Sequence, residues 1–276
     1  MPLTLGYNTN GFPHHRLTDA IEILADLGYR AVALTLDHHA LNPYEPDLPA
    51  RVREVRHLLD RRQLTCVIET GARFLLDPRR KHHPTLLDAD PAARDRRLDF
   101  LRWAVAIAAD LGAPAVSLWS GARPADVRPG EAWGFLTDAC HDLLPLAEAR
   151  NVSLAFEPEP GMFIETMDHY RDLRDRLAHP RFGLTLDVGH VHCLADGDPA
   201  ARVREFAADL RHVHIEDMRR GVHEHLQFGD GDMDFPPLIA ALRDIAYDGP
   251  VCVELSHHGH DAVNAAKRAF DYLSKL

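Results

Sequence analysis

The sequence predicts a single-domain α/β protein that folds as a (β/α)8 barrel over residues 1–276. Three observations favour this fold class. Short apolar runs of strand type alternate with amphipathic runs of helix type along the whole chain. The strand-type runs are aliphatic or β-branched on both faces, as in buried parallel strands. No linker, low-complexity tract or repeat of fixed period divides the chain, so one domain is expected.

The strand-type runs can be placed in order along the chain. They cover Leu3–Thr9, Ala31–Leu36, Thr65–Thr70, Ala115–Trp119, Ser153–Glu157, Gly183–Asp187, His212–Glu216 and Val251–Leu255. The clearest helix begins at Asp90-Pro91, an N-cap followed by proline at the first helical position, and ends at Gly112. An open doubly wound sheet is the alternative. It fits less well because the segment after the first strand, Asn8–Pro13, is not a glycine-rich phosphate-binding loop.

Two long segments are predicted to be irregular, Gly71–Ala89 and Gly221–Phe235. Both follow strands. In a barrel they lie on the rim formed by the carboxyl ends of the strands, where long loops act as lids or substrate walls.

Composition excludes several classes of protein. Hydrophobic residues make up 46% of the chain and charged residues 26%, as in an ordinary globular protein. The net charge of -11 argues against a nucleic-acid binder. The four cysteines form no CxxC pair, which favours a reducing, cytoplasmic location. No leader pattern or membrane-spanning apolar run is present, so no membrane partner is expected.

Four metal-type ligands lie at the ends of four successive strands: Glu157, Asp187, His214 and Glu254. A single acid at a strand end is usually solvated or paired with a base. Because the carboxyl ends of barrel strands converge, four such residues in series favour a shared site. Carboxylate oxygens with one imidazole suit a divalent cation such as Mn²⁺, Mg²⁺, Co²⁺ or Zn²⁺.

Several motifs resemble those of a known family. They are Phe156-Glu157-Pro158, Leu186-Asp187-Val188-Gly189-His190, His212-Val213-His214-Ile215-Glu216-Asp217, Phe228-Gly229-Asp230-Gly231-Asp232-Met233-Asp234-Phe235 and Val253-Glu254-Leu255. Together they resemble the xylose isomerase-like TIM-barrel superfamily, and within it the sugar phosphate isomerase/epimerase-like group. The resemblance implies one divalent metal ion held by Glu157, Asp187, His214 and Glu254.

The resemblance also implies a reaction and a substrate class. The metal would polarise a carbonyl and an adjacent hydroxyl of a small sugar or cyclitol, so that the neighbouring C–H is acidified through an enediolate. Glu157 and Glu254 would act as the acid/base pair on opposite sides of the carbon. Return of the proton gives epimerisation or isomerisation. Loss of a β-hydroxyl from the same enediolate would give a dehydratase or lyase instead.

Substrate contacts are implied at further positions. His190 lies where related epimerases touch substrate oxygens, and Arg220 where the family often places an arginine, with Arg219 as an alternative. Glu159 puts a second carboxylate on the same rim. Phe163 replaces the acid that related ketose epimerases carry, which argues against a simple ketose 3-epimerase.

Other rim residues are less diagnostic. Glu69 is a candidate for hydroxyl binding, with a salt bridge to Arg73 as the alternative. Trp119 is a candidate for stacking on a sugar ring. His223 and His225 have the spacing of a ligand pair, but substrate contacts or a loop role are preferred because four metal ligands are already assigned.

Two other classes of function stay open: a zinc nuclease for abasic DNA, as in the same superfamily, and a non-catalytic metabolite-binding barrel. The charge of -11 opposes the first and the glutamate pair opposes the second. The absence of a phosphate-binding glycine loop favours an unphosphorylated substrate. A homo-oligomer is left open.

Overall fold

Eight parallel strands close into a barrel, in the order β1-β10-β7-β6-β5-β4-β3-β2, which confirms the predicted fold. The structure is a computed structural model and describes residues 3–276; Met1 and Pro2, which begin the stretch inspected for a leader, lie outside the described residues. The barrel strands are β1 (Thr4–Asn8), β2 (Ala31–Thr35), β3 (Thr65–Glu69), β4 (Ala115–Leu118), β5 (Ser153–Phe156), β6 (Phe182–Asp187), β7 (Leu210–Ile215) and β10 (Pro250–Val253).

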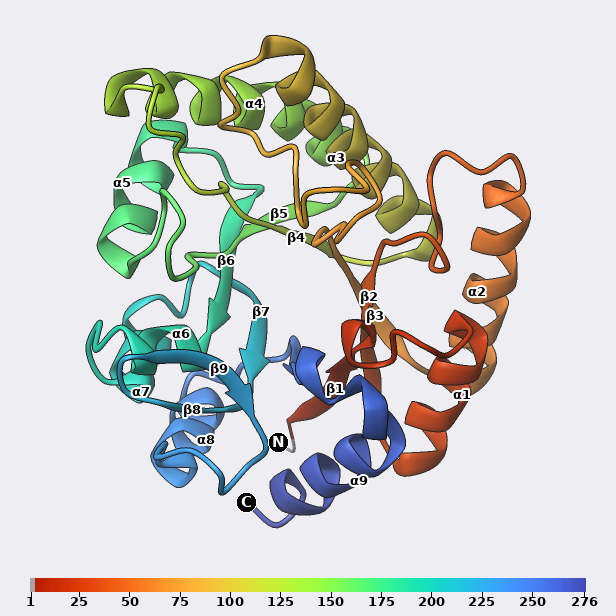
Figure 1. The fold of residues 1–276 in the computed structure, drawn as a ribbon. Helices are drawn as coiled ribbons and strands as arrows, with labels where there is room; N and C mark the ends of the chain where they lie inside the picture. Colours follow the sequence, from red (N-terminus) through yellow and green to blue (C-terminus); the bar gives the residue numbers. More distant parts are fainter. Residues whose placement is uncertain (1–2) are drawn as a thin grey trace.

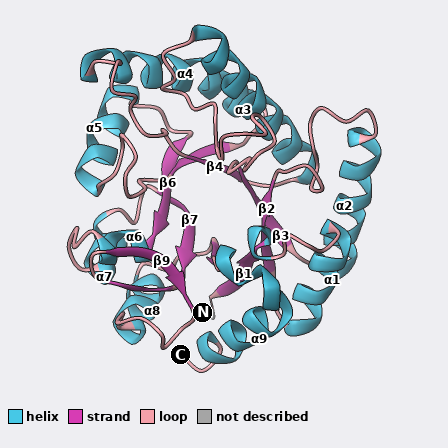
Figure 2. Ribbon diagram, in the orientation of Figure 1, coloured by secondary structure: helices cyan, strands magenta, loops and turns pink. Residues whose placement is uncertain are grey.

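The helices form a ring around the strands, and the apolar core fills the space between the two layers (Figures 1 and 2). They are α1 (Leu17–Leu27), α2 (Leu48–Arg62), α3 (Pro91–Leu111), α4 (Pro129–Ala149), α5 (Met167–Leu177), α6 (Val188–Cys193), α7 (Pro199–Glu205), α8 (Phe235–Asp244) and α9 (Ala262–Leu273), with short 3-10 helices at Thr9–Gly11 and Ser256–Asp261. No helix within residues 3–276 combines the length and the hydropathy that crossing a bilayer requires. All four cysteines are unpaired and buried.

The strands end one or two residues earlier than the sequence suggests. β4 ends at Leu118, β5 at Phe156 and β10 at Val253, so Trp119, Glu157 and Glu254 directly follow their strands. Shifts of this size are ordinary at element ends. They leave the side chains on the carboxyl-end rim.

The segment Gly221–Phe235 is not wholly irregular, which corrects the prediction for it. Residues Val222–Leu226 form β9, which pairs antiparallel with β8 (Asp217–Arg219). The turn is made by Arg220 and Gly221, and Gly221 has φ +75°, a backbone conformation that favours glycine. Since β9 is exposed over Val222–Glu224 and its three central residues are polar, the strand lacks the apolar run by which sequence analysis finds buried strands.

Helix α3 is capped as the sequence predicts, and its cap can be tested. The Asp90 side chain accepts a hydrogen bond from the Ala92 backbone N–H at 3.0 Å, and Gly112 ends the helix in the left-handed conformation. We expect Asp90→Ala to lower the free energy of unfolding by about 1 kcal/mol, because a helix N–H loses its acceptor. Urea denaturation measures this. Asp95→Ala, an exposed change on the same helix, is the control; an equal loss in both variants would contradict a capping role.

Candidate metal and substrate site

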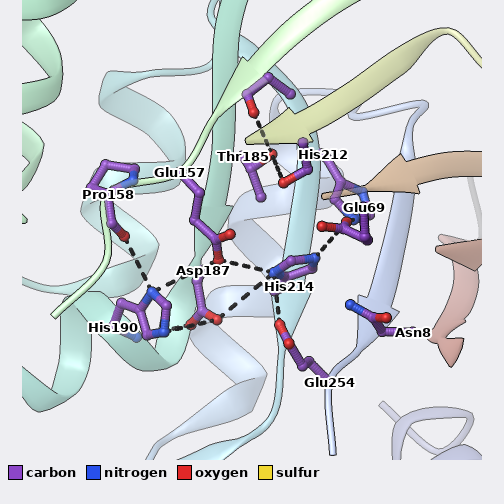
Figure 3. Close-up of polar contacts among 12 residues, drawn as sticks. Asn8, Glu69, Glu157, Pro158, Thr185, Asp187, His190, His212, His214 and Glu254 are labelled. Carbon is purple, nitrogen blue, oxygen red and sulfur yellow. Dashed lines mark hydrogen bonds and ion pairs between the residues drawn. The ribbon is translucent and has the colours of Figure 1, made fainter. Parts of the chain in front are cut away.

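Four side chains from adjacent barrel strands meet at the carboxyl-end rim. Asp187 ends β6, His214 lies in β7, and Glu157 and Glu254 follow β5 and β10. Each can place a ligand atom so that all four atoms lie within 4.8 Å of one another. His214 Nδ1 is 3.1 Å from Glu157 Oε1, 3.0 Å from Glu254 Oε2 and 3.9 Å from Asp187 Oδ2 (Figure 3).

The chemistry of this group fits a divalent cation. Asp187 is 2% exposed, and its Oδ2 has no hydrogen-bond partner among the described residues. A buried carboxylate oxygen without a partner is costly unless a cation or a proton compensates it. Three carboxylates and one imidazole supply the hard oxygen ligands and single nitrogen that Mn²⁺, Mg²⁺, Co²⁺ or Zn²⁺ accept.

Local structure explains how Asp187 and its loop are held. The Asp187 carboxylate caps helix α6 by accepting a hydrogen bond from the His190 backbone N–H at 2.9 Å. Gly189 lets the first turn of α6 approach β7, since a Cβ there would lie 2.1 Å from Glu216 Oε1. The Asp187-Val188-Gly189-His190 motif is therefore a tight strand-to-helix turn that aims Asp187 at the other ligands.

The protonation of the group follows from burial and mutual charge. Burial raises the pKa of Glu157 well above its usual value, although His214 opposes the shift. Burial acts in the same direction on Glu254, but its contacts with His214 and Asn10 outweigh it and hold the pKa of Glu254 well below normal. Burial lowers the pKa of His214, yet the surrounding carboxylates raise it well above normal overall. Protonation of Glu157 and His214 therefore offsets only part of the negative charge of this group.

Glu69 lies on the far side of His214 from the other carboxylates. Its Oε1 is 3.0 Å from His214 Nε2 and 3.0 Å from His212 Nε2. Because a carboxylate only accepts, the hydrogen of a neutral His214 resides on Nε2, and the Nδ1 lone pair faces the other ligands. The alternative salt bridge between Glu69 and Arg73 is wrong: the Arg73 guanidinium donates to the Asn10 backbone carbonyl instead.

Three of the four side chains, Glu157, His214 and Glu254, line a cavity of about 310 Å³, whereas Asp187 is not among its lining residues. Of the other residues singled out from sequence, Glu69, Trp119, Glu159 and His190 line it. Arg220 does not; it is exposed in the turn between β8 and β9, and Arg219 donates to the Asp230 carbonyl.

Burial shifts the pKa of two of these cavity-lining residues, Glu159 and His190. Burial, with the charges of Glu254 and Asp187, raises the pKa of Glu159 to about 8. Burial lowers the pKa of His190 to about 4, so its imidazole is neutral near pH 7. His190 Nδ1 lies 3.2 Å from the Pro158 carbonyl, to which it donates, and this leaves Nε2 as an acceptor.

Two histidines of the β8–β9 hairpin line the cavity next to His190. His223 Nε2 is 3.0 Å from His190 Nε2, and His225 Nδ1 is 3.1 Å from the Glu254 carbonyl. The three imidazoles place ring nitrogens within 4.8 Å of one another and form a second group with metal-type ligands. The hairpin therefore forms part of the site.

Sequence analysis missed several residues of the cavity. The Asn10 amide donates to Glu254 Oε1 at 2.6 Å and so orients that carboxylate. Arg73, Lys81 and His82 come from the long segment after β3 and line the same cavity. Arg73, Lys81 and His82 belong to Gly71–Ala89, the segment expected to form a lid or substrate wall, but no sequence pattern singles out Lys81 or His82 within it.

Comparison with known proteins agrees with the fold. A family model described as xylose isomerase-like TIM barrel matches residues 21–276. An uncharacterized protein of Methanocaldococcus jannaschii is 22% identical over 293 residues, covering 99% of this chain and 90% of the relative. The L-ribulose-5-phosphate 3-epimerase UlaE of Shigella flexneri is 24% identical over 214 residues, covering 76% of this chain and 74% of the relative.

Solved structures are similar over nearly the whole chain. The 3-keto-D-glucoside 4-epimerase YcjR of E. coli has a TM-score of 0.81 at 16% identity, with full coverage of both chains. The D-allulose 3-epimerase of Methylomonas has a TM-score of 0.78 at 20% identity, covering 99% and 97%. The IOLI protein, solved with a zinc atom, has a TM-score of 0.76 at 16% identity, covering 99% of each chain. At these identities the likeness shows the fold.

Proposed function

The chain belongs to the xylose isomerase-like TIM barrel family, and from this membership and the geometry of its cavity we propose a divalent-metal-dependent isomerase or epimerase of a small carbohydrate or cyclitol. The observation that carries the proposal is the pair of glutamates beside His214. Glu157 and Glu254 reach the same ring nitrogen from β5 and β10, at 3.1 and 3.0 Å. Epimerisation needs two such groups, one for each face of the reacting carbon.

We assign the metal to Glu157, Asp187, His214 and Glu254. When bound, the cation would supply Lewis-acid polarisation of a substrate carbonyl and its neighbouring hydroxyl. The zinc atom in the similar IOLI structure supports this assignment. The sugar epimerase activities of UlaE, YcjR and the D-allulose enzyme support the substrate class.

The chain's own residues move the protons. In this proposal one of the two glutamates, Glu157 or Glu254, accepts the proton from the C–H next to the carbonyl, and the other returns a proton on the opposite side of the carbon. Asn10 orients Glu254 by donating a hydrogen bond to its carboxylate. His190, Glu159, Glu69 and Trp119 line the space for substrate hydroxyls and the ring face. Arg220 is left out of the proposed site because it does not reach the cavity.

Deuterium uptake tests the function. Keto-sugars and keto-inositols are incubated with the Mn²⁺-loaded protein in D₂O, and exchange is read by NMR. We expect deuterium at the carbon next to the carbonyl of a reactive substrate, with an epimer or isomer as product. A product that lacks one water would identify the dehydratase alternative. Absence of exchange with every compound in the panel would refute the proposal.

The cysteines and the net charge support a proposal for the cellular location and for the kind of substrate. Four unpaired, buried cysteines are typical of a reducing compartment, and we place the enzyme in the cytoplasm. The net charge of -11 favours a small sugar over a nucleic acid as the partner.

A further inference from the structure

Two cations on the loop between β3 and α3 have no role in the chemistry described so far. Arg73 and Lys81 both line the cavity. Neither forms an ion pair within 4.0 Å of a carboxylate in residues 3–276. Arg80 on the same loop, by contrast, is paired with Asp77 at 2.8 Å. Arg79, also on this loop, is exposed, does not line the cavity and likewise forms no ion pair within residues 3–276. Arg73 and Lys81 are therefore distinguished by their place in the cavity lining.

Arg73 keeps most of its hydrogen-bonding capacity. One amino group of its guanidinium donates to the Asn10 carbonyl, which anchors the side chain next to the residue that holds Glu254. No other hydrogen bond of this guanidinium is found within the described residues. An arginine carries five N–H donors in a planar fork, a shape that matches a carboxylate or a phosphate.

The loop that carries the two cations is held in place. Its Leu75, Leu76, Leu86 and Leu87 are buried in the core. The His82 backbone N–H donates to the Arg73 carbonyl at 2.6 Å, and this bond joins the two parts of the loop that carry Arg73 and Lys81. Its cationic side chains are therefore presented by a preorganised segment, which lowers the entropy cost of binding.

Backbone strain lies next to both cations. Ala72 precedes Arg73 and has φ +53°, and His82 follows Lys81 and has φ +66°. Residues other than glycine rarely adopt these left-handed backbone conformations. Strained backbone of this kind is found more often at binding sites than elsewhere. The His82 ring also packs edge-on against Trp119, with ring centroids 5.8 Å apart, and this contact joins the loop to the aromatic wall of the cavity.

Charge determines what this part of the cavity would bind. Near the proposed metal ligands the cavity is lined by the carboxyl groups of Glu69, Glu157, Glu159 and Glu254. The arginine and lysine side chains of the cavity lining are those of Arg73 and Lys81, so an anionic substrate group that does not bind the metal gains most beside them.

We propose that Arg73 and Lys81 form an anion subsite, which binds a carboxylate or phosphate group at the end of the substrate remote from the reacting carbons. The identity of the rest of the substrate as a sugar rests on the proposed function; binding of the anion does not. The missing glycine-rich loop favoured an unphosphorylated substrate, but here side chains supply the recognition that such a loop would give.

Charge-removing variants test the subsite. Arg73→Met and Lys81→Met, singly and together, are compared with Arg79→Met, which removes a charge from an exposed position of the same loop. Titration calorimetry of the metal-loaded protein uses inorganic phosphate and D-glucuronate as probes. We expect the double variant to bind one or both probes about 10- to 100-fold more weakly, with Arg79→Met unchanged.

Each outcome decides a specific point. Loss for phosphate alone identifies a phosphate ester as the natural group, and loss for glucuronate alone identifies a sugar acid. Equal binding of both probes in the wild type and the double variant would overturn the subsite, since the anions would then bind the metal or another surface. If no sugar exchanges deuterium but the double variant still loses anion binding, the proposed function fails while the subsite stands.

Discussion

Glu157→Gln and Glu254→Gln are each expected to lower kcat by about 10²- to 10⁴-fold, the usual contribution of a general acid or base. Glutamine keeps the shape and one oxygen ligand but neither accepts nor returns the substrate proton. Under the proposed roles the two residues act on opposite sides of the reacting carbon, so each variant loses one half of the proton transfer. Steady-state kinetics on the substrate found by deuterium exchange, at saturating Mn²⁺, measures the effect.

The two variants also distinguish removal of the proton on one face of the carbon from its return on the other face. A variant that lacks only the returning acid is expected to keep deuterium exchange while losing epimer formation. Glu224→Gln, an exposed change on β9, serves as the control and is expected to keep full turnover. If both active-site variants bind metal and turn over at the wild-type rate, the assignment of roles is wrong.

Removal of the metal with a chelator is expected to stop turnover and to lower Tm by roughly 5–15 °C. A cation present at 100 to 1,000 times its Kd stabilises the folded state by about 3–4 kcal/mol, and in a chain of this size each kcal/mol corresponds to about 2–4 °C. The carboxylates of Glu157, Asp187 and Glu254 would also repel one another once the cation is removed. Scanning calorimetry with and without EDTA, followed by addition of Mn²⁺, gives the measurement.

Asp187→Asn provides the matched comparison for this experiment. It removes the charge of a buried residue of the proposed metal site, so its Tm is expected to respond little to EDTA or Mn²⁺. A wild-type Tm that stays constant under chelation, together with a metal-free elemental analysis, would count against a resident cation.

The barrel fold and the clustering of the four metal-type side chains could be predicted from the sequence. Buried strands such as Leu184–Asp187 and helix signals such as Asp90-Pro91 are local patterns, and their strict alternation leaves few folds. Once the fold is a barrel, residues at successive strand ends must share one rim. For this reason Glu157, Asp187, His214 and Glu254 are found together in the structure.

The conformations of the loops could not be predicted from the sequence, because they depend on contacts between residues that are distant in sequence. The β8–β9 hairpin is short, and its second strand has three polar residues in a row, so no buried apolar run marks it, and Arg220 in its turn does not line the cavity. Glu69 pairs with His214, 145 residues away, and not with nearby Arg73.

The order of apolar and polar residues by itself determined an eight-unit barrel with three carboxylates and one imidazole at one end, since periodicity and strand ends are properties of short segments. Only the tertiary structure decided which partners orient those ligands, as Asn10 does for Glu254 across 244 residues, and which loop cations face the cavity. Such pairings form when the barrel closes and brings distant strand ends to one rim. Burial and charge at this rim then determine which contacts are stable.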